Sequence, residues 1–318
     1  MKTSVLLLGL VAAFWAAGSA LADMQYYLVS GYTSNNIVRY DATTGAVIDE
    51  FVPSGSGGLT RPEGLAIGPD GNLYVASSNT HTIKRYDGQT GAYLGNFASG
   101  NGLDYPRGIT FGPDGNLYVA SSNDTIKRFN GTTGEFIDDF VPYGTTNLSD
   151  PQDLVFHDDN KLYISNSWSA SITRENAQTG AYIDTLYQGV LYDFIPQGMA
   201  FGADGNLYVA DSGANAVLRF DVVTGTLIGA FVPPGAGGLN QPEDVLFGID
   251  GNLLVTSYYG SSVLRYDGAT GEPLGTFAIG GGLECPTYML YVPEPGAFVL
   301  FVVVGLISPK FRDLIEGK

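Results

Sequence analysis

Residues 62–97 read PEGLAIGPDGNLYVASSNTHTIKRYDGQTGAYLGNF, and this stretch decides the fold. Short apolar, β-branched and aromatic runs alternate in it with two turn sequences, Pro69-Asp70-Gly71-Asn72 and Asp87 to Gly91. Asp-Gly-Asn and Thr-Gly suit tight hairpins, because glycine and asparagine tolerate a positive φ. We therefore expect one four-stranded sheet, with strands at residues 62–67, 73–76, 83–86 and 92–97.

This unit is repeated along the chain. A Thr-Gly pair occurs six times, with spacings of 46, 43, 46, 45 and 46 residues, at Thr44-Gly45, Thr90-Gly91, Thr133-Gly134, Thr179-Gly180, Thr224-Gly225 and Thr270-Gly271. A period in the forties with four strands is typical of a propeller blade, because one such sheet cannot cover both of its faces and must stack on neighbours. The sequence thus predicts an all-β six-bladed propeller over residues 23–292.

The two ends of the repeat region complement each other. Residues 24–29 match the second strand of a blade, so the first blade lacks its innermost strand. Residues 286–291 match an innermost strand that no further blade follows. We expect three N-terminal strands and this C-terminal strand to form blade one together. Such closure removes the exposed sheet edges of an open stack.

The start of the chain matches an export signal. Lys2 precedes the apolar run 5–17 and then Ala20-Leu21-Ala22, which is the charged start, hydrophobic middle and small-residue cleavage site of a secretory signal peptide. We expect residues 1–22 to be removed on export. The single cysteine, Cys285, excludes an internal disulfide framework, so packing must stabilise the fold.

The end of the chain carries a second targeting pattern. Pro293-Glu294-Pro295 is followed by an apolar run over residues 296–308 and then by Lys310 and Arg312. Residues 293–318 resemble the PEP-CTERM sorting signal. The resemblance implies processing by an exosortase-type enzyme, with Pro293, Glu294 and Pro295 as the sorting motif. It also implies location at the cell surface, outer envelope or extracellular matrix of a bacterium, and a membrane anchor before or instead of processing.

The chain is strongly acidic, with 15 Lys and Arg against 32 Asp and Glu and a formal net charge of −17. A field of this sign repels phosphate backbones, so nucleic acid is excluded as a partner. It favours cations or neutral ligands such as sugars. The alternative is that the charge only keeps an exported protein soluble.

The repeated motifs also resemble a known family. They are Pro-x-Gly, Gly-Pro-Asp-Gly-Asn-Leu-Tyr-Val-Ala-Ser and Ile-x-Arg-Tyr, as in residues 62–86. They are similar to the NHL-type six-bladed propellers and their relatives, the streptogramin lyases and the gluconolactonase family. This resemblance implies the architecture only, because the superfamily contains lyases, lactonases and pure binding proteins.

Comparison of the repeats separates scaffold residues from candidate site residues. An arginine occupies the same column in every blade, at Arg39, Arg85, Arg128, Arg174, Arg219 and Arg265. A functional patch would not be distributed so regularly. We expect these arginines to make inter-strand or inter-blade hydrogen bonds, since the guanidinium fork suits fixed acceptors.

At other aligned positions of the repeat, near the channel mouth, the residue type differs between blades. The loop that enters the innermost strand and the loop after the second strand share one face of a propeller, called here the top face. In the first of these loops, Gly64, Gly108 and Gly198 correspond to Asp153, Asp244 and Tyr288 in the other blades. In the second, Gly31, Ser77, Ser121 and Ser257 correspond to Asn166 and Asp211.

These exceptions predict a polar wedge made by Asp153, Asn166, Asp211 and Asp244, with Glu243 beside it. Carboxylate and amide oxygens suit a hard divalent cation such as Ca²⁺. The metal-dependent lactonases among the resembling families use a similar Glu, Asn and Asp set at the channel mouth. The alternative is that these side chains are solvated or cap turns.

Aromatic residues are frequent in the loops of the same face, at Tyr32, Tyr105, Trp168, Tyr192, Tyr258 and Tyr259. Beside an acidic rim, Trp168 and Tyr258 are candidates for stacking on sugar rings, although such residues also fill the interfaces between blades.

Two functions remain open at this stage. The sequence favours a non-enzymatic propeller that binds a glycan or a protein through its top face. The alternative is a calcium-dependent lactonase-like hydrolase or a lyase that uses the channel-mouth carboxylates. Only two histidines occur, His81 and His157, and neither is predicted at the channel, which leaves a lyase without a histidine base.

Overall fold

A computed structural model describes residues 25–145 and 147–293. In these residues the chain forms six sheets of four strands each. One compact unit, Tyr27–Leu290, contains all six sheets except the end residues of β1 and β24. The predicted signal peptide, residues 1–22, and the tail from Glu294 to residue 318 lie outside the described residues.

The sheets are blades numbered in chain order, and each is given from its innermost to its outermost strand. Blade 1 contains β24 (Pro286–Val292), β1 (Tyr26–Gly31), β2 (Asn36–Asp41) and β3 (Val47–Val52). Blade 2 contains β4 (Pro62–Ile67), β5 (Leu73–Ser77), β6 (Thr82–Tyr86) and β7 (Tyr93–Ser99). Blade 3 contains β8 (Pro106–Phe111), β9 (Leu117–Ser121), β10 (Thr125–Phe129) and β11 (Phe136–Val141).

The second half of the ring repeats this order. Blade 4 contains β12 (Pro151–His157), β13 (Lys161–Asn166), β14 (Ser171–Asn176) and β15 (Tyr182–Gln188). Blade 5 contains β16 (Pro196–Phe201), β17 (Leu207–Asp211), β18 (Ala216–Phe220) and β19 (Leu227–Val232). Blade 6 contains β20 (Pro242–Phe247), β21 (Leu253–Ser257), β22 (Ser262–Tyr266) and β23 (Pro273–Ile279). Short 3₁₀ turns occur at η1 (Ser56–Gly58), η2 (Ser78–Thr80) and η3 (Ala236–Gly238).

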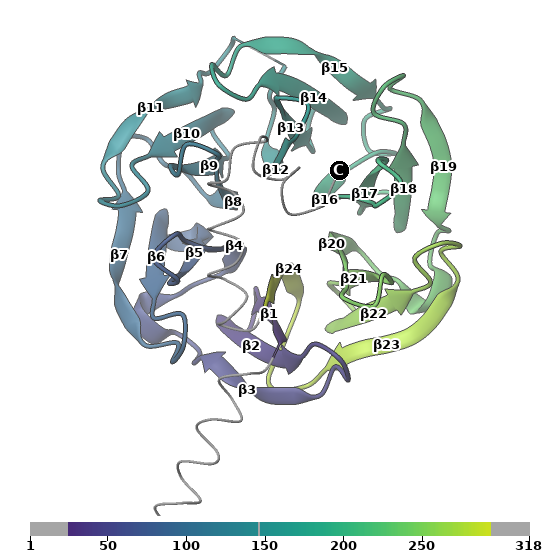
Figure 1. The fold of residues 1–318 in the computed structure, drawn as a ribbon, viewed down its shortest axis with the longest axis horizontal. Coiled ribbons are helices and arrows are strands. Elements are labelled where there is room, and N and C mark those ends of the chain that lie inside the picture. The colour runs from purple at the N-terminus through teal and green to yellow at the C-terminus, as the bar shows by residue number, and fades with distance from the viewer. Residues whose placement is uncertain (1–24, 146, 294–318) are drawn as a thin grey trace, which may run out of the picture. The chain divides into compact units, whose positions relative to one another are not determined.

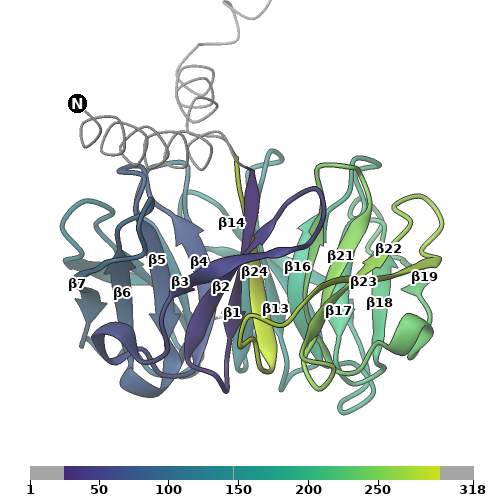
Figure 2. The same ribbon diagram turned by 90° about the horizontal axis from the view of Figure 1, so that it is seen from below.

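The predicted fold class and ring closure are both confirmed. Figure 1 shows the six sheets around a common centre, with yellow β24 beside purple β1. The Tyr288 N–H on β24 donates to the Ser30 hydroxyl on β1 at 2.9 Å, which ties the two ends of the ring together. Figure 2 shows the same ring turned by 90°, with the strands running between its two faces.

Aromatic contacts join each blade to the next. In the Leu-Tyr-Val-Ala strand of blade 2, Tyr74 packs edge-on against Phe97 of its own blade, with ring centroids 4.6 Å apart. It also packs against Phe111 of blade 3, at 5.0 Å. The same tyrosine column places Tyr118 and Tyr208 between two phenylalanines each. Edge-to-face pairs stabilise such contacts beyond the burial of their area.

The Thr-Gly pair has a clear structural cause. Gly91 adopts a φ of 71°, and a Cβ at this position would overlap the carbonyl oxygen of Phe51 in the preceding blade. Gly45 stands in the same relation to Phe277. Only glycine combines this backbone conformation with so close an approach. The repeat signal therefore marks contacts between blades.

Three members of the arginine column make the predicted hydrogen bonds, and the other three lie near aspartates of a hairpin turn. Arg39, Arg128 and Arg174 each donate to an aspartate on the fourth strand of their own blade, at Asp49, Asp138 and Asp184. Arg85, Arg219 and Arg265 instead lie 3.9, 3.9 and 3.6 Å from Asp70, Asp204 and Asp250 in the first hairpin turn. Arg174 also donates to the Val222 carbonyl of blade 5 at 2.7 Å, which is an inter-blade bond.

Candidate functional site

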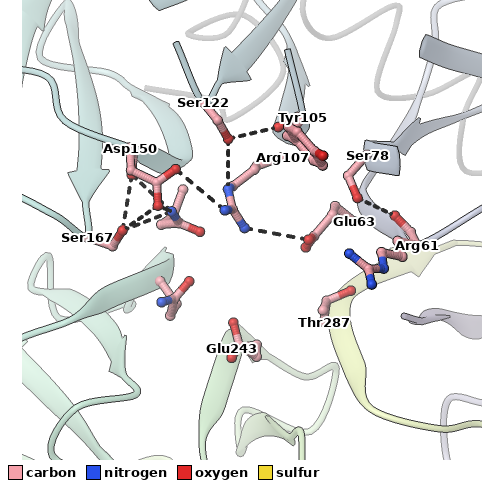
Figure 3. A network of polar contacts seen from close by, with 12 residues as sticks. Arg61, Glu63, Ser78, Tyr105, Arg107, Ser122, Asp150, Ser167, Glu243 and Thr287 are labelled. Atoms are coloured by element: carbon pink, nitrogen blue, oxygen red, sulfur yellow. Dashed lines mark hydrogen bonds and ion pairs between the residues drawn. The ribbon is translucent and has the colours of Figure 1, made fainter. Parts of the chain in front are cut away.

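Each innermost strand begins with a proline, and the residue after this proline changes around the ring. In chain order these residues are Glu63, Arg107, Gln152, Gln197, Glu243 and Thr287, called here the mouth ring. Figure 3 shows Glu63, Arg107, Glu243 and Thr287 placed around one open centre. A column that varies directly after a constant proline is the pattern expected of a ligand site rather than of a scaffold.

A cavity of ≈ 780 Å³ opens at this mouth. Four mouth-ring residues line it, together with residues of the top-face loops: Arg107, Gln152, Gln197, Glu243, Asp150, Ser167, Trp168, Leu191, Tyr192, Ile195, Ser212 and Gln241. Its volume lies within the range of small-molecule binding sites. The cavity therefore combines guanidinium, amide, carboxylate and hydroxyl groups with two aromatic side chains.

Arg107 lies at the centre of the polar network in Figure 3. Its guanidinium nitrogens lie 3.6 Å from a Glu63 carboxylate oxygen and 3.5 Å from an Asp150 carboxylate oxygen. Its Nε donates to the Ser122 hydroxyl at 3.3 Å. The two ion pairs are longer than charge-assisted hydrogen bonds, so the guanidinium is shared between carboxylates rather than docked onto one.

Asp150 is fixed by other contacts. The Gln152 side-chain amide donates to an Asp150 carboxylate oxygen at 2.7 Å, and the Ser167 hydroxyl donates to the same oxygen at 2.8 Å. Asp150 has a φ of 51°, and its N–H donates to the Asp124 carboxylate of blade 3 at 2.8 Å. The equivalent residues before the proline in other blades, Arg61, Tyr105, Gln241 and Cys285, also have a positive φ, so this conformation belongs to the repeat and positions Asp150 as part of the scaffold.

Similar hydrogen bonds hold the residue before the first proline of other innermost strands. The side chains of Asn35, His81 and Asn215, each in a loop between second and third strands, accept the backbone N–H of Arg61, Tyr105 and Gln241 in the following blade. At the junction of blades 4 and 5 this position is Ala170, which has no such acceptor. The loop that enters β16 takes another path there, and Trp168 and Tyr192 are 73% and 79% exposed beside the cavity.

Burial perturbs two mouth-ring carboxyls. Burial raises the pKa of Glu63 to about 8, against the lowering effect of Arg107 and with a further rise from Glu243. Burial likewise raises the pKa of Glu243 to about 7, although the Gln241 amide donates to it at 2.7 Å. In the absence of a ligand, burial therefore favours the protonated, uncharged forms of these two carboxyls.

Below the mouth ring, Asp153 and Asp244 bind the backbone of a neighbouring blade. An Asp153 carboxylate oxygen accepts the Met199 N–H at 2.9 Å, and one of Asp244 accepts the Met289 N–H at 2.8 Å. Burial raises the pKa of Asp153 to about 6 and moves that of Asp244 in the same direction. These two candidates from the sequence act as inter-blade contacts.

Asn166 and Asp211 hold the entering loops. The Asn166 side-chain oxygen accepts the Ser149 N–H at 3.4 Å, and an Asp211 carboxylate oxygen accepts the Ile195 N–H at 2.9 Å. The Ser77 hydroxyl has the same role in blade 2, where it accepts the Thr60 N–H. Serine, Asn166 and Asp211 thus all supply a hydrogen-bond acceptor for the entering loop. The change of residue type in this column keeps that structural role and does not indicate a ligand-binding group.

Each of the four predicted calcium ligands accepts a backbone N–H group. In residues 25–145 and 147–293, no group of three or more His, Cys, Asp or Glu side chains is arranged to hold a metal ion. Of the other candidates, Trp168 and Glu243 line the cavity. Tyr258 packs against Tyr32 and Tyr259 outside the cavity lining, with ring centroids 6.0 and 5.1 Å away.

Sequence reasoning missed most of the mouth ring. It compared the third residue of each innermost strand, although the second residue, after the proline, lines the mouth. The signal was present in the sequence, because Pro62, Pro106, Pro151, Pro196, Pro242 and Pro286 are constant and the residue that follows each is not.

Neither histidine lines the cavity. The His81 Nδ1 accepts the Tyr105 N–H at 3.1 Å, and the ring packs edge-on against Tyr105. His157 stacks on Phe201 with ring centroids 4.0 Å apart. Both imidazoles thus support loops and hairpins.

Comparison with known proteins agrees with the propeller fold. Residues 59–86, which contain β4, β5 and β6, match the model of the NHL repeat. The protein is a six-bladed β-propeller with an NHL repeat. No curated protein matches this chain in sequence.

Solved structures share the architecture. A chain in the crystal structure of the nidogen/laminin complex is 19% identical, with a TM-score of 0.67, and the match covers 85% of this chain and 99% of that one. A Bacteroides caccae protein of unknown function is 16% identical, with a TM-score of 0.65 and the same coverage of 85% and 99%. Virginiamycin B lyase from Staphylococcus aureus is 18% identical, with a TM-score of 0.57 and coverage of 86% and 85%. At these identities the likeness concerns the fold.

Proposed function

We propose that this NHL propeller is an exported, surface- or matrix-associated protein that binds a glycan in the cavity at its top face. One observation carries the proposal: the cavity of ≈ 780 Å³ presents Arg107, three glutamine amides and carboxylates beside the exposed rings of Trp168 and Tyr192. Sugars offer hydroxyls that need both donors and acceptors, and their apolar ring faces stack on aromatic side chains.

A protein partner is the second candidate. Val190, Leu191 and Tyr192 are 66%, 48% and 79% exposed in the loop that enters β16. An exposed apolar loop next to an open mouth suits a protein surface. The related fold in the nidogen/laminin complex shows that such a propeller occurs in a protein assembly.

An enzyme remains the alternative class, as a calcium-dependent lactonase-like hydrolase or a lyase. That function needs convergent metal ligands or a histidine base at the channel. The candidate carboxylates instead accept backbone N–H groups of the scaffold, as the contacts of Asp153, Asp211 and Asp244 illustrate. The geometry therefore favours binding.

The export part of the proposal rests on the two ends of the sequence. The signal-peptide pattern of residues 1–22 supports secretion, and the Pro-Glu-Pro tail supports sorting by an exosortase-type enzyme. No helix in the described ranges has both the length and the apolar composition needed to cross a bilayer.

Calorimetric titration with a panel of neutral and amino-sugar oligosaccharides tests glycan binding. The Trp168→Ala variant should bind roughly tenfold more weakly than the wild type, because one stacking contact is lost. Tyr143→Ala is the matched control, since Tyr143 is also 73% exposed but does not line the cavity. Absence of heat with every sugar, or equal losses in both variants, contradicts the proposal.

A further inference from the structure

The acidic groups at the mouth are not balanced by cations. Glu63, Asp150 and Glu243 surround a single half-buried guanidinium, that of Arg107. Arg61 is exposed and lies over the Tyr32 ring, 5.3 Å from its centroid. Asp153 and Asp244 add two further carboxyls beneath, and the phenols of Tyr32 and Tyr288 also face this region.

Asp150 and Glu63 differ in the hydrogen bonds that their carboxylates accept. Asp150 takes hydrogen bonds from Gln152 and Ser167 in addition to its ion pair with Arg107. Glu63 is only 5% exposed, yet no donor in the part of the chain that the structure describes hydrogen-bonds to its carboxylate. Its nearest cation is the Arg107 guanidinium at 3.6 Å. A buried carboxylate without a hydrogen bond is unfavourable unless a ligand supplies the donor.

Glu243 offers a second acceptor at the same mouth. Its carboxylate receives one hydrogen bond, from the Gln241 amide, and it lines the cavity. Figure 3 shows Glu63 of blade 2 and Glu243 of blade 6 around the same open centre. Two acceptors with spare lone pairs therefore lie at this mouth: Glu243 in the lining of the cavity, and Glu63 next to the lining residue Arg107.

We infer that the ligand of this cavity carries a positively charged amine, which is received between the carboxylates of Glu63 and Glu243. The inference rests on the proposed glycan-binding function and makes the ligand an amino sugar. An ammonium group supplies three donors and the missing positive charge at once. The exposed faces of Trp168 and Tyr192 at the rim attract the same cation, and the net charge of −17 enriches cations near the protein.

Proton release should accompany binding. Because burial raises the pKa of Glu63 to about 8 and that of Glu243 to about 7, both carboxyls are largely protonated in the free protein at pH 6. A bound ammonium stabilises their ionised forms, so protons leave the site when it binds. An uncharged ligand has no such effect.

The test compares glucosamine oligosaccharides with N-acetylglucosamine oligosaccharides of equal length, by calorimetry at a pH where the amine is charged. These probes differ in one group, since acetylation removes the charge. The amine form should bind roughly ten- to a hundredfold more tightly. Titrations in two buffers of different ionisation enthalpy should show net proton release with the amine form only.

Glu63→Gln, Glu243→Gln and the double variant localise the amine. The double variant should bind both oligosaccharides with similar affinity and release no proton. If neither oligosaccharide binds the wild type, the proposed glycan binding fails. If both bind it equally, glycan binding stands and the amine inference is overturned. A preference that persists in the folded double variant also overturns it.

Discussion

The hydroxyl of Tyr288 on β24 donates to the backbone carbonyl of Gln152 on β12 at 2.5 Å. These strands belong to blades 1 and 4, so the bond spans the central channel. The donor lies on β24, the last strand of the described chain. The acceptor lies on β12, whose residue Gln152 lines the cavity. Tyr288 thus contributes its backbone N–H to ring closure and its hydroxyl to a bond with the strand that carries Gln152, a residue of the cavity lining.

Replacement of this tyrosine tests the bond. Tyr288→Phe should lower the free energy of unfolding by about 1–2 kcal/mol, because the buried Gln152 carbonyl loses its donor. Tyr182→Phe is the control, since its hydroxyl bonds Thr185 at an exposed position and its loss should cost under about 0.5 kcal/mol. Urea denaturation measures both. Equal losses would show that the bond across the channel contributes nothing.

A second prediction concerns Glu175, which stands where other blades have Tyr40, Tyr86, Phe129, Phe220 and Tyr266. The side chain is fully buried, and in the described residues neither carboxylate oxygen has a hydrogen-bond partner. Burial raises its pKa from 4.5 to about 8. The folded state thus retains a proton that the unfolded state loses, and stability from this group falls as pH rises from 4.5 through 8.

Glu175→Phe should therefore raise the free energy of unfolding by roughly 2–4 kcal/mol at pH 8 and by less at pH 5. Glu175→Gln separates charge from packing, since it removes the pH dependence without restoring the aromatic ring. Urea titrations at several pH values measure the difference between variant and wild type. A difference that does not change with pH would contradict the assignment.

The placement of the predicted calcium ligands leads to a third prediction. Asp153, Asp211 and Asp244 already accept scaffold N–H groups, so we expect no heat on titration of Ca²⁺ into the chelated protein. The melting temperature should also stay unchanged on addition of calcium. Asp244→Ala should lower the free energy of unfolding by about 1–3 kcal/mol with or without calcium, because the Met289 N–H loses its acceptor. Calcium-dependent melting that Asp244→Ala abolishes would restore the metal-site hypothesis.

His81 provides a fourth test, because its role can be supplied by another residue. Asn35 in blade 1 and Asn215 in blade 5 accept the equivalent backbone N–H of the following blade. His81→Asn should therefore stay within about 0.5 kcal/mol of the wild type, whereas His81→Ala should lose about 1 kcal/mol. Thermal unfolding of both variants decides this. A larger loss in the asparagine variant would mean that the imidazole does more than accept the Tyr105 N–H.

The fifth prediction addresses the tail. A chain that ends at Val292 keeps all of β24 and so should fold and be secreted freely. The full chain should partition with membranes or extracellular matrix, if the Pro293-Glu294-Pro295 pattern acts as a sorting signal. Fractionation of producing cells measures the distribution. The same distribution for both chains would refute the sorting hypothesis.

The sequence predicted the architecture well because its causes are local and repeated. The strand and turn patterns of residues 62–97 recur in each blade, and the glycine of each Thr-Gly turn is required by the approach of the preceding blade, as at Gly91. The missing strand at one end and the surplus strand at the other were sufficient to predict that β24 completes blade 1. Trp168 was predicted as an aromatic residue of the top-face loops and Glu243 as a residue beside the polar wedge, and both line the cavity.

Most of the site could not be predicted in this way. Asp153, Asn166, Asp211 and Asp244 break the repeat as a ligand set does, but each binds backbone of an adjacent loop or blade. A change of residue type does not reveal whether an acceptor serves the scaffold or a ligand. That depends on which N–H groups the neighbouring blade brings within reach.

By itself, the sequence determined the number of blades, their strand order and the way the ring closes, because hairpin turns and strand patterns act over a few residues. Only the tertiary structure decided that Glu63, Arg107 and Glu243 meet at one mouth. These residues belong to three blades, and their charges interact only after closure of the ring brings the innermost strands together and buries the carboxyls of Glu63 and Glu243.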